Sequence, residues 1–414
     1  MKIALVTIGT RGDVQPYIAV AQALMARGHD VKIAASEDHG PLLAAHGVPH
    51  HVLGHNFREL LRSDLGRAWL TSGESPRQYA RYAKELFLPL QRALCEEVDA
   101  AVEGSDAIAF YALAIFAMHA AQRRRLPMVA LSPWAMVPSA EFTPLVALAN
   151  APGFLRRLSG HLVLRVGFSG FNEVHQQYRE SVGLPRWRAG DVVHAIIESR
   201  IPYIGLFSEA VFPRPRDWAA HHHVAGFAFV PTLPYSPPKA LTDFLASGAP
   251  PIYIGFGSMT GLDPNELAAL ATRAARSAGV RAVIATGLAE LDVAASDDVY
   301  VVDEIPHDWL FPRVSAVVHH GGAGTFAEGL RAGKPTVIAA FFGDQPIWGW
   351  INERNGSGPP ALLRKTLDAP KLAAAIRRAL DGAYTERARE IAARIAAEDG
   401  AGRAAELIES ALSR

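Results

Sequence analysis

The 414-residue sequence has almost no cysteine and no excess of charge of either sign. Cys95 is the only cysteine, which excludes an intramolecular disulfide and a cysteine-based zinc site and fits a reducing compartment. The 41 basic residues equal the 41 acidic ones, so the positive excess of nucleic-acid-binding proteins is missing. We therefore expect a cytoplasmic protein that binds no nucleic acid.

Long apolar runs are missing as well. The N-terminal run, 2–8, is too short for a signal peptide and is followed by Gly9 and Arg11. The longest apolar stretch, 107–121, is shorter than the roughly 20 residues that a membrane-spanning helix needs. We expect no transmembrane segment, although the sequence is compatible with peripheral contact to a membrane.

Alternating strand and helix patterns fill a chain long enough for two domains. An apolar run at 2–8, a glycine turn and a helical pattern lead to a second strand at 31–35, which is a βαβ unit. After a proline-rich stretch the alternation restarts, with a helix at 264–278 and strands at 251–256, 282–285, 299–302, 316–319 and 336–340. We predict an α/β protein with domains at 1–212 and 241–395, a linker at 213–240, and a C-terminal helix, 396–414, packing back on the first domain.

The segment with the most chemical information is 317–326. An apolar strand runs into a glycine-rich turn and then into a helix, with His320, Gly322, Gly324 and Thr325 around the turn. The free N–H groups and the dipole at such a helix N-terminus attract anions, and glycines let a diphosphate approach the backbone. A tight turn without any ligand remains the alternative.

Other polar residues follow neighbouring strands. Asp344 and Gln345 come after the strand at 336–340, Ser258 after the strand at 251–256, and Ile305 and Pro306 after the strand at 299–302. The carboxyl ends of parallel strands share one edge of a sheet, which is where ligands bind in open α/β folds. Asp344 and Gln345 suit sugar hydroxyls, and the alternative for Asp344 is a helix N-cap.

Asp13 opens the first helix of the first domain, directly after Gly12. A carboxylate there is suited to take a proton from an acceptor hydroxyl, while an isolated Asp at this position also serves as an N-cap. The preceding turn lacks the third glycine of the dinucleotide fingerprint, and no P-loop, HExxH or GxSxG motif occurs. We do not expect the histidines at 221–223 to bind a metal ion.

Together these segments resemble the UDP-glycosyltransferases of the GT-B fold, above all the sterol 3β-glucosyltransferases and the bacterial antibiotic glycosyltransferases. The resemblance is carried by residues 9–16, 306–312, 319–325 and 341–346, by Trp348-Gly349, and by Pro133-Trp134 with Glu141-Phe142. It implies two Rossmann-like domains with parallel sheets facing across a crevice, and an inverting transfer that uses no cofactor and no metal ion.

The resemblance also implies roles for individual residues. Asp13 would be the catalytic base, a position where many plant and animal relatives carry His. The donor would contact Gly12, Ser258, Ile305, Pro306, His320, Gly322, Gly324, Thr325, Glu328, Asp344 and Gln345. The acceptor would contact Phe57, Trp134, Met136 and Phe142, which the residue types alone place equally well in a core.

The expected reaction is transfer of a hexose, glucose from UDP-glucose, to a hydroxyl of a sterol, polyketide, macrolide or phenol. A dTDP-deoxysugar transferase of antibiotic tailoring is the alternative within the same class. A UDP-sugar epimerase and a non-catalytic binder of a hydrophobic ligand are alternatives from other classes. The Ala- and Arg-rich composition suggests a bacterial source, and the sequence indicates no oligomeric state.

Overall fold

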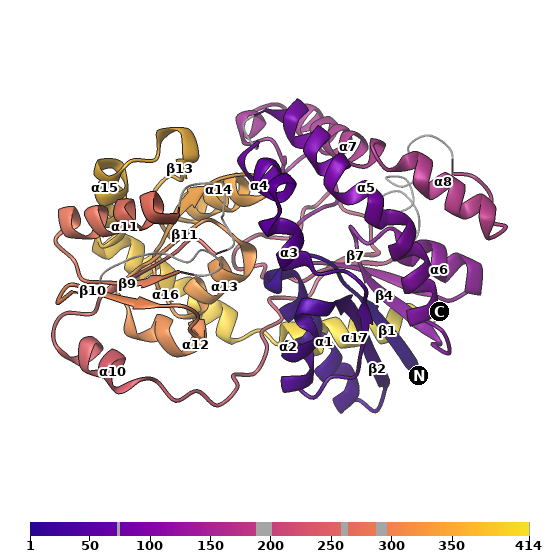
Figure 1. Ribbon diagram of the computed structural model, residues 1–414, viewed down its shortest axis with the longest axis horizontal. Coiled ribbons are helices and arrows are strands. Elements are labelled where there is room, and N and C mark those ends of the chain that lie inside the picture. Colours follow the sequence, from indigo (N-terminus) through magenta and orange to yellow (C-terminus); the bar gives the residue numbers. More distant parts are fainter. Residues whose placement is uncertain (73–74, 188–200, 258–263, 287–295, 414) are drawn as a thin grey trace. The chain divides into compact units, whose positions relative to one another are not determined.

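The structure, a computed structural model, describes residues 1–72, 75–187, 201–257, 264–286 and 296–413. The chain forms two compact units, each built around its own sheet (Figure 1). Unit 1 consists of Met1–Trp69, Pro76–Pro231 and Glu398–Arg414, and unit 2 consists of Leu70–Ser75 and Thr232–Ala397.

Unit 1 contains a seven-stranded parallel sheet with the order β3-β2-β1-β4-β5-β6-β7. Its strands are β1 (Lys2–Val6), β2 (Asp30–Ser36), β3 (His50–Leu53), β4 (Ala107–Tyr111), β5 (Met128–Ser132), β6 (Tyr203–Gly205) and β7 (His222–Val224). The central strands are apolar on both faces, as expected for a parallel sheet covered by helices on both sides. The strand order reverses between β1 and β4, which makes the carboxyl end of β1 a switch point.

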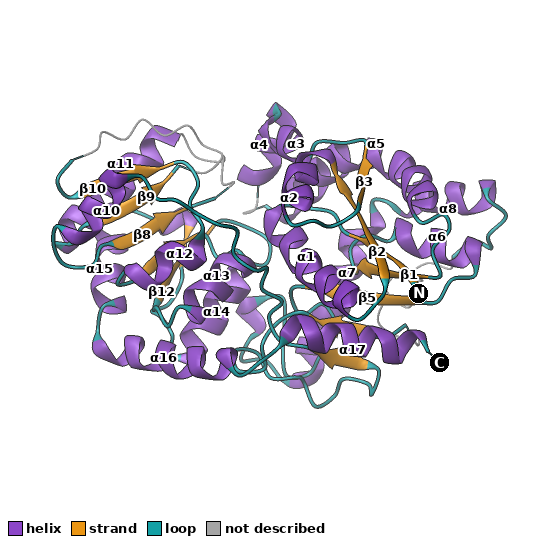
Figure 2. Cartoon of the chain, turned by 90° about the horizontal axis from the view of Figure 1, so that it is seen from below, coloured by secondary structure: helices purple, strands orange, loops and turns teal. Residues whose placement is uncertain are grey.

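The helices of unit 1 are α1 (Arg11–Ala26), α2 (Gly40–Ala45), α3 (Phe57–Arg62), α4 (Asp64–Thr71), α5 (Pro76–Ala101), α6 (Phe116–Arg124), α7 (Gly153–Ser169), α8 (Asn172–Ser181) and α17 (Gly400–Leu412), with 3₁₀ turns η1 (Glu37–His39) and η2 (Val146–Leu148). Helix α17 ends the chain and contacts α1 and β5 (Figure 2). Glu409 on α17 accepts hydrogen bonds from Arg27, with Nη2–Oε2 at 2.7 Å, and holds the C-terminal helix in unit 1.

Unit 2 contains a six-stranded parallel sheet with the order β10-β9-β8-β11-β12-β13. Its strands are β8 (Ile252–Gly255), β9 (Ala282–Ala285), β10 (Val299–Val302), β11 (Val317–His319), β12 (Thr336–Ala340) and β13 (Leu362–Leu363). Its helices are α10 (Lys239–Ala246), α11 (Pro264–Ala278), α12 (His307–Leu310), α13 (Ala323–Arg331), α14 (Gln345–Asn355), α15 (Ala369–Ala379) and α16 (Gly382–Ala396), with 3₁₀ turns η4 (Phe311–Arg313) and η5 (Arg364–Thr366).

Most expected elements of unit 2 are confirmed, including the helix at 264–278 and the strands at 282–285, 299–302 and 336–340. The main difference concerns the expected linker at 213–240. Strand β7 lies inside this range and pairs with β6, and the chain passes between the units at Pro231–Thr232. The linker is therefore shorter than expected. Strand β7 was not predicted, because a three-residue strand beginning with two histidines leaves no recognisable apolar pattern. None of the described helices is long and apolar enough to cross a membrane.

Candidate active site

The site in unit 2 is built at the carboxyl edge of its sheet. Strands β8, β11 and β12 are neighbours in the sheet and run parallel. The chain moves from β8 outward through β9 to β10, and then from β11 outward through β12 to β13, so the switch point lies between β8 and β11. Loops that leave neighbouring strands in opposite directions make room for a ligand at such a point.

The turn between β11 and α13 requires glycine. Gly321 has a φ of +98°, and a Cβ there would lie 2.9 Å from Ile338 Cγ2 and 3.1 Å from the carbonyl oxygen of Gln345. Gly322 is the N-cap of α13, and a Cβ there would lie 2.6 Å from His320 Nε2. A side chain at either position would push the turn outward, so these glycines keep the first N–H groups of α13 open to an anion.

The two histidines of this segment differ in function. His319 is buried, and its Nδ1 accepts a hydrogen bond from Gly321 N at 3.0 Å, which fixes the turn. The His320 ring is half-buried and lies against Gly257, the residue that ends the described part of the β8 loop. Burial lowers the pKa of His320 to about 4, so its imidazole is neutral at pH 7 and has one N–H to donate.

Gln345 and Asp344 shape the turn after β12. The Gln345 side chain is buried, and its Oε1 accepts hydrogen bonds from Phe341 N at 2.7 Å and Phe342 N at 3.2 Å. Asp344 stands at the N-cap position of α14, but its Oδ2 accepts from Trp348 Nε1 at 2.9 Å rather than capping the helix. Burial raises the pKa of Asp344. The oxygen of Gln345 thus holds its own loop, and Asp344 is the more exposed of the pair.

The remaining donor residues lie around this edge. Ile305 is buried among apolar residues of unit 2, and Pro306 is the N-cap of α12. Gly324 and Thr325 are half-buried in the first turn of α13, where the predicted anion site requires them. Ser258 lies outside the described residues.

Glu328 lies on α13, beyond the first turn, and is half-buried. Burial raises its pKa to about 7, Arg331 opposes this shift, and the carboxylate of Asp308 adds to it. Arg331 Nη1 lies 3.5 Å from Glu328 Oε1. Glu328 thus combines a pKa raised toward neutral pH with a position more than one turn from the N-terminus of α13.

Asp13 stands at the switch point of unit 1. Its Oδ2 accepts hydrogen bonds from Thr10 N at 2.9 Å and Thr10 Oγ1 at 3.1 Å, which closes a capping box at the start of α1. A Cβ on Gly9 would lie only 2.4 Å from this oxygen, so glycine is needed there. Gly12 next to it is not crowded. Asp13 is half-exposed, and the capping role and a catalytic role are therefore compatible.

The four expected acceptor residues differ in their burial. Met136 and Phe142 are buried in unit 1, Phe142 with its ring edge-on against Phe212 at 5.2 Å. Trp134 is half-buried and donates its Nε1–H to Tyr111 Oη at 3.1 Å. Phe57 begins α3 and its ring is stacked with that of Phe87. Met136 and Phe142 are thus buried, while Trp134 and Phe57 keep partly accessible surfaces, and the acceptor role of all four residues stays a prediction.

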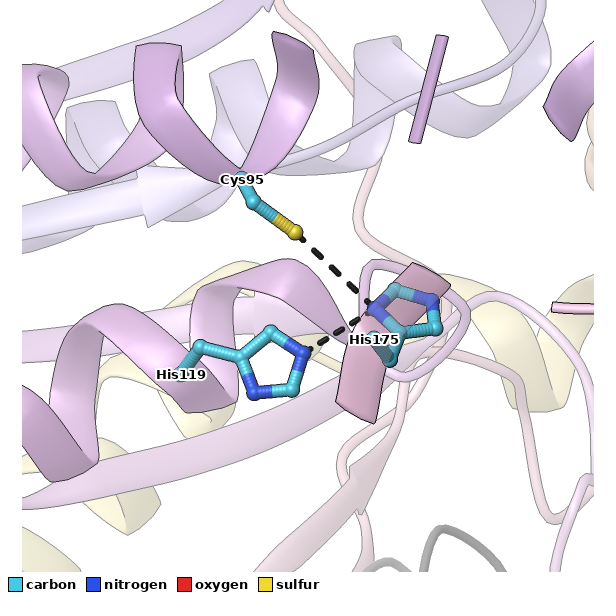
Figure 3. A group of neighbouring side chains, drawn as sticks. All are labelled: Cys95, His119 and His175. Carbon is cyan, nitrogen blue, oxygen red and sulfur yellow. Dashed lines mark hydrogen bonds between the residues drawn. The ribbon is translucent and has the colours of Figure 1, made fainter. Parts of the chain in front are cut away.

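Unit 1 also contains a buried cluster of possible metal ligands, Cys95, His119 and His175 (Figure 3). His119 Nε2 lies 3.0 Å from His175 Nδ1, and Arg179 Nη1 lies 3.2 Å from His119 Nδ1. A guanidinium only donates, so His119 Nδ1 must accept and its proton must sit on Nε2, which donates to His175. A metal ion on His119 Nε2 would force that proton to the nitrogen that faces Arg179. The cluster is therefore a buried hydrogen-bond chain.

Sequence reasoning missed three of the residues that shape these sites. Thr10 orients Asp13, Gly321 permits the turn before α13, and Trp348 holds Asp344. The spacing of Thr10 and Asp13, a hydroxyl residue three positions before a carboxylate at a helix start, is a capping signal that could have identified the first. The indole contact of Trp348 one turn further along α14 also follows from helical spacing.

Comparisons with known proteins agree with this arrangement. The glycosyltransferase family 28 N-terminal domain matches residues 3–109, and the C-terminal domain of erythromycin biosynthesis protein CIII-like proteins (EryCIII-like) matches residues 273–409. The two matches lie in different halves of the chain. Gly9 to Asp13 lie in the family 28 domain, and the β11–α13 turn lies in the EryCIII-like domain.

Similar proteins extend over the whole chain. Sterol 3-beta-glucosyltransferase UGT80A2 of Arabidopsis thaliana is 33% identical over 417 residues, covering 97% of this chain and 64% of its own length. The chain therefore spans less than two thirds of this relative. The glycosyltransferase of kitacinnamycin has a TM-score of 0.70 at 21% identity, covering 99% of this chain and 98% of its own. VinC, solved in complex with dTDP, has a TM-score of 0.68 at 18% identity over the full length of both chains. The expected GT-B fold of two parallel-sheet α/β units is confirmed.

Proposed function

We propose that this protein is an inverting glycosyltransferase that moves a hexose, glucose from UDP-glucose, to a hydroxyl group of an apolar small molecule such as a sterol, polyketide or phenol. The observation that carries the proposal is the glycine turn at the N-terminus of α13, which stands at the sheet's switch point within the EryCIII-like domain. The similarity to a sterol 3-beta-glucosyltransferase supports the acceptor class.

The donor site is proposed on unit 2. The first N–H groups of α13 and the neutral N–H of His320 would hold the diphosphate, and Ile305 and Pro306 would border the base. Asp344 would accept from a sugar hydroxyl, and Gln345 would keep the loop of Asp344 in place through its contacts to the backbone. This scheme uses no metal ion: the helix N-terminus and the N–H of His320 would stabilise the charge that develops on the departing diphosphate.

In the reaction, the acceptor oxygen forms a bond to the anomeric carbon while the bond from that carbon to the diphosphate oxygen breaks. The acceptor proton goes to the carboxylate of Asp13, and the electron pair of the broken bond leaves with UDP. Asp13 need not be a strong base, because the acceptor hydroxyl becomes acidic as its oxygen bonds to the oxocarbenium-like carbon. Thr10 orients the carboxylate through two hydrogen bonds to one of its oxygens, Oδ2.

Glu328 gives this proposal a pH dependence. If its ionised carboxylate accepts from the ribose hydroxyls, UDP binding should strengthen as the pH rises through the pKa of about 7. We expect the ratio of UDP affinities of the wild type and Glu328→Gln to be near unity at pH 6 and to reach about tenfold at pH 8, from charge-assisted hydrogen bonds. Calorimetric titration of both proteins across this range measures the ratio, and the variant cancels the titration of UDP itself. A ratio that stays constant with pH contradicts the ribose contact.

A dTDP-deoxysugar donor is the second candidate, favoured by the likeness to VinC, whose structure contains dTDP. The same anion site would hold either diphosphate, so the two donors differ only at the base and the sugar. We also propose a cytoplasmic location, supported by the single cysteine, which is buried and whose pKa burial raises to about 12. The Ala- and Arg-rich composition supports a bacterial source.

The test is release of UDP by the purified protein, with EDTA present, from UDP-glucose and a panel of sterols, macrolides and flavonoids. Release that depends on one acceptor class supports glucosyl transfer and names the acceptor. Release only from a dTDP-deoxysugar favours the second candidate. UDP bound without release from any donor supports a non-catalytic binder, and conversion of UDP-glucose to another UDP-sugar without an acceptor supports an epimerase.

A further inference from the structure

The distribution of buried and exposed side chains on helix α7 differs from that of an ordinary surface helix. Its buried face carries small residues: Ser159 Oγ lies 2.7 Å from Thr143 Oγ1, and a Cβ on Gly160 would lie 2.9 Å from Pro138 Cβ. Five of its large apolar side chains are exposed, whereas Leu164 is buried. Phe154 is 70% exposed and Leu158 is 60% exposed. A helix that only had to pack on unit 1 would show the opposite pattern.

The exposed apolar residues of α7 form one stripe. Phe154, Leu158, Leu162 and Val166 recur every fourth residue, so they share one face of the helix over about 18 Å. Leu162 and Val166 are more than half exposed, as are the other two. In the part of the chain that the structure describes, eleven large apolar residues are exposed, and seven of them lie between positions 145 and 166. Such clustering marks a binding surface rather than scattered surface residues.

The segment before α7 adds to this stripe. Leu145 and Val146 are exposed, and the Leu145 backbone is joined to α7 through Thr143, whose Oγ1 accepts from Leu145 N and contacts Ser159 Oγ. We give the name α7 face to the four residues of the stripe together with Leu145, Val146 and Leu155. The position of helix α7 at the outer edge of unit 1 can be followed in Figure 1.

The charged residues of helix α7 itself are of one sign. Helix α7 has no acidic residue, and Arg157 and Arg165 on it are exposed. Arg165 lies within the stripe and Arg157 at its flank, by helical spacing. Exposed Lys84 of α5 lies beside the end of α7, since a Cβ on Gly170 would lie 3.6 Å from its Cγ. Long cationic side chains next to exposed leucines suit a surface that is apolar inside and anionic outside.

We propose that the α7 face binds the surface of a membrane containing anionic lipids, with α7 lying in the plane of the interface. Its aliphatic and aromatic side chains enter the boundary of the acyl chains, and Arg157, Arg165 and Lys84 contact headgroup phosphates. A second copy of the chain fits this face less well, because two cationic faces would repel each other. The proposal does not depend on the proposed function, since it involves neither donor nor acceptor.

The test is flotation of the full chain with vesicles, without any nucleotide or acceptor. Vesicles of phosphatidylcholine are compared with vesicles that also contain phosphatidylglycerol. We expect the wild type to float with the anionic vesicles, Leu158→Glu/Leu162→Glu to lower binding at least about tenfold, and Arg157→Gln and Arg165→Gln to lower it about fivefold each. Leu233→Glu/Leu363→Glu, which places the same charges on exposed leucines of unit 2, should float like the wild type.

Thermal unfolding and the far-UV circular dichroism spectrum check that each variant is folded. A salt titration of the wild type tests the same surface without any mutation, and its vesicle binding should fall as salt rises. Absence of flotation with anionic vesicles, or equal flotation of the wild type and Leu158→Glu/Leu162→Glu, overturns the proposal. So does a wild-type dimer that the double variant dissociates without any vesicle binding, which would assign the α7 face to self-association.

Discussion

Asp13→Asn is expected to lower kcat by about 10²–10⁴-fold and to leave UDP binding unchanged. Asn removes the proton acceptor, but its carbonyl oxygen can still accept from Thr10 N, so the capping box largely survives. We therefore expect the free energy of unfolding to fall by less than about 1 kcal/mol. Steady-state kinetics with the acceptor identified by the panel, calorimetric UDP binding and thermal unfolding measure the three quantities.

Thr10→Val is the matched control for Asp13→Asn. It removes the hydroxyl that donates to Asp13 Oδ2 at 3.1 Å and keeps both the carboxylate and the backbone donor. A loss of activity much smaller than that of Asp13→Asn would show that the carboxylate itself is required. If Asp13→Asn instead unfolds at a clearly lower temperature or no longer binds UDP, Asp13 is a structural residue of the α1 start and the base must be sought elsewhere.

The local pattern of the sequence predicts the strands and helices of unit 2 well. The strand at 336–340, the glycine turn and the helix at 264–278 are short-range features, because apolar runs, glycines and helical spacing act within a few residues. Parallel strands then bring the turns together at one edge without further information. This is why His320, Gly322 and Thr325 could be expected near the same anion site from the sequence alone.

The direction in which a side chain points could not be predicted in the same way. Gln345 has the residue type of a sugar ligand, but contacts with the backbone of Phe341 and Phe342 turn its oxygen into the loop. Met136 and Phe142 are buried while Leu158 is exposed, although all three are large and apolar. Burial depends on the packing of distant segments, such as the close approach of Gly160 to Pro138, which lies on the face of α7 opposite to the exposed Leu158.

His320→Ala is expected to have the second largest effect on turnover. In the proposed scheme the neutral imidazole donates one hydrogen bond to the diphosphate as its charge grows, and loss of one such donor lowers kcat by about 10²–10³-fold. The Ala side chain also leaves empty the space beside Gly257 that the His320 ring occupies in the wild type. His320→Asn keeps an N–H donor in a smaller side chain, so we expect it to recover part of the lost rate. Pre-steady-state UDP release separates this effect from slow product dissociation.

The pH profile decides which form of His320 acts. Burial lowers its pKa to about 4, so the imidazole stays neutral from pH 5.5 upward and its titration should leave no step in kcat across that range. An imidazolium donor would behave in the opposite way: the rate would fall as the pH rises through about 6.5, the ordinary histidine pKa. Comparing the profiles of the wild type and His320→Ala isolates this contribution. A falling limb near pH 6.5 in the wild type that disappears in His320→Ala would mean that the diphosphate raises the pKa of His320 and that a full positive charge stabilises the leaving group.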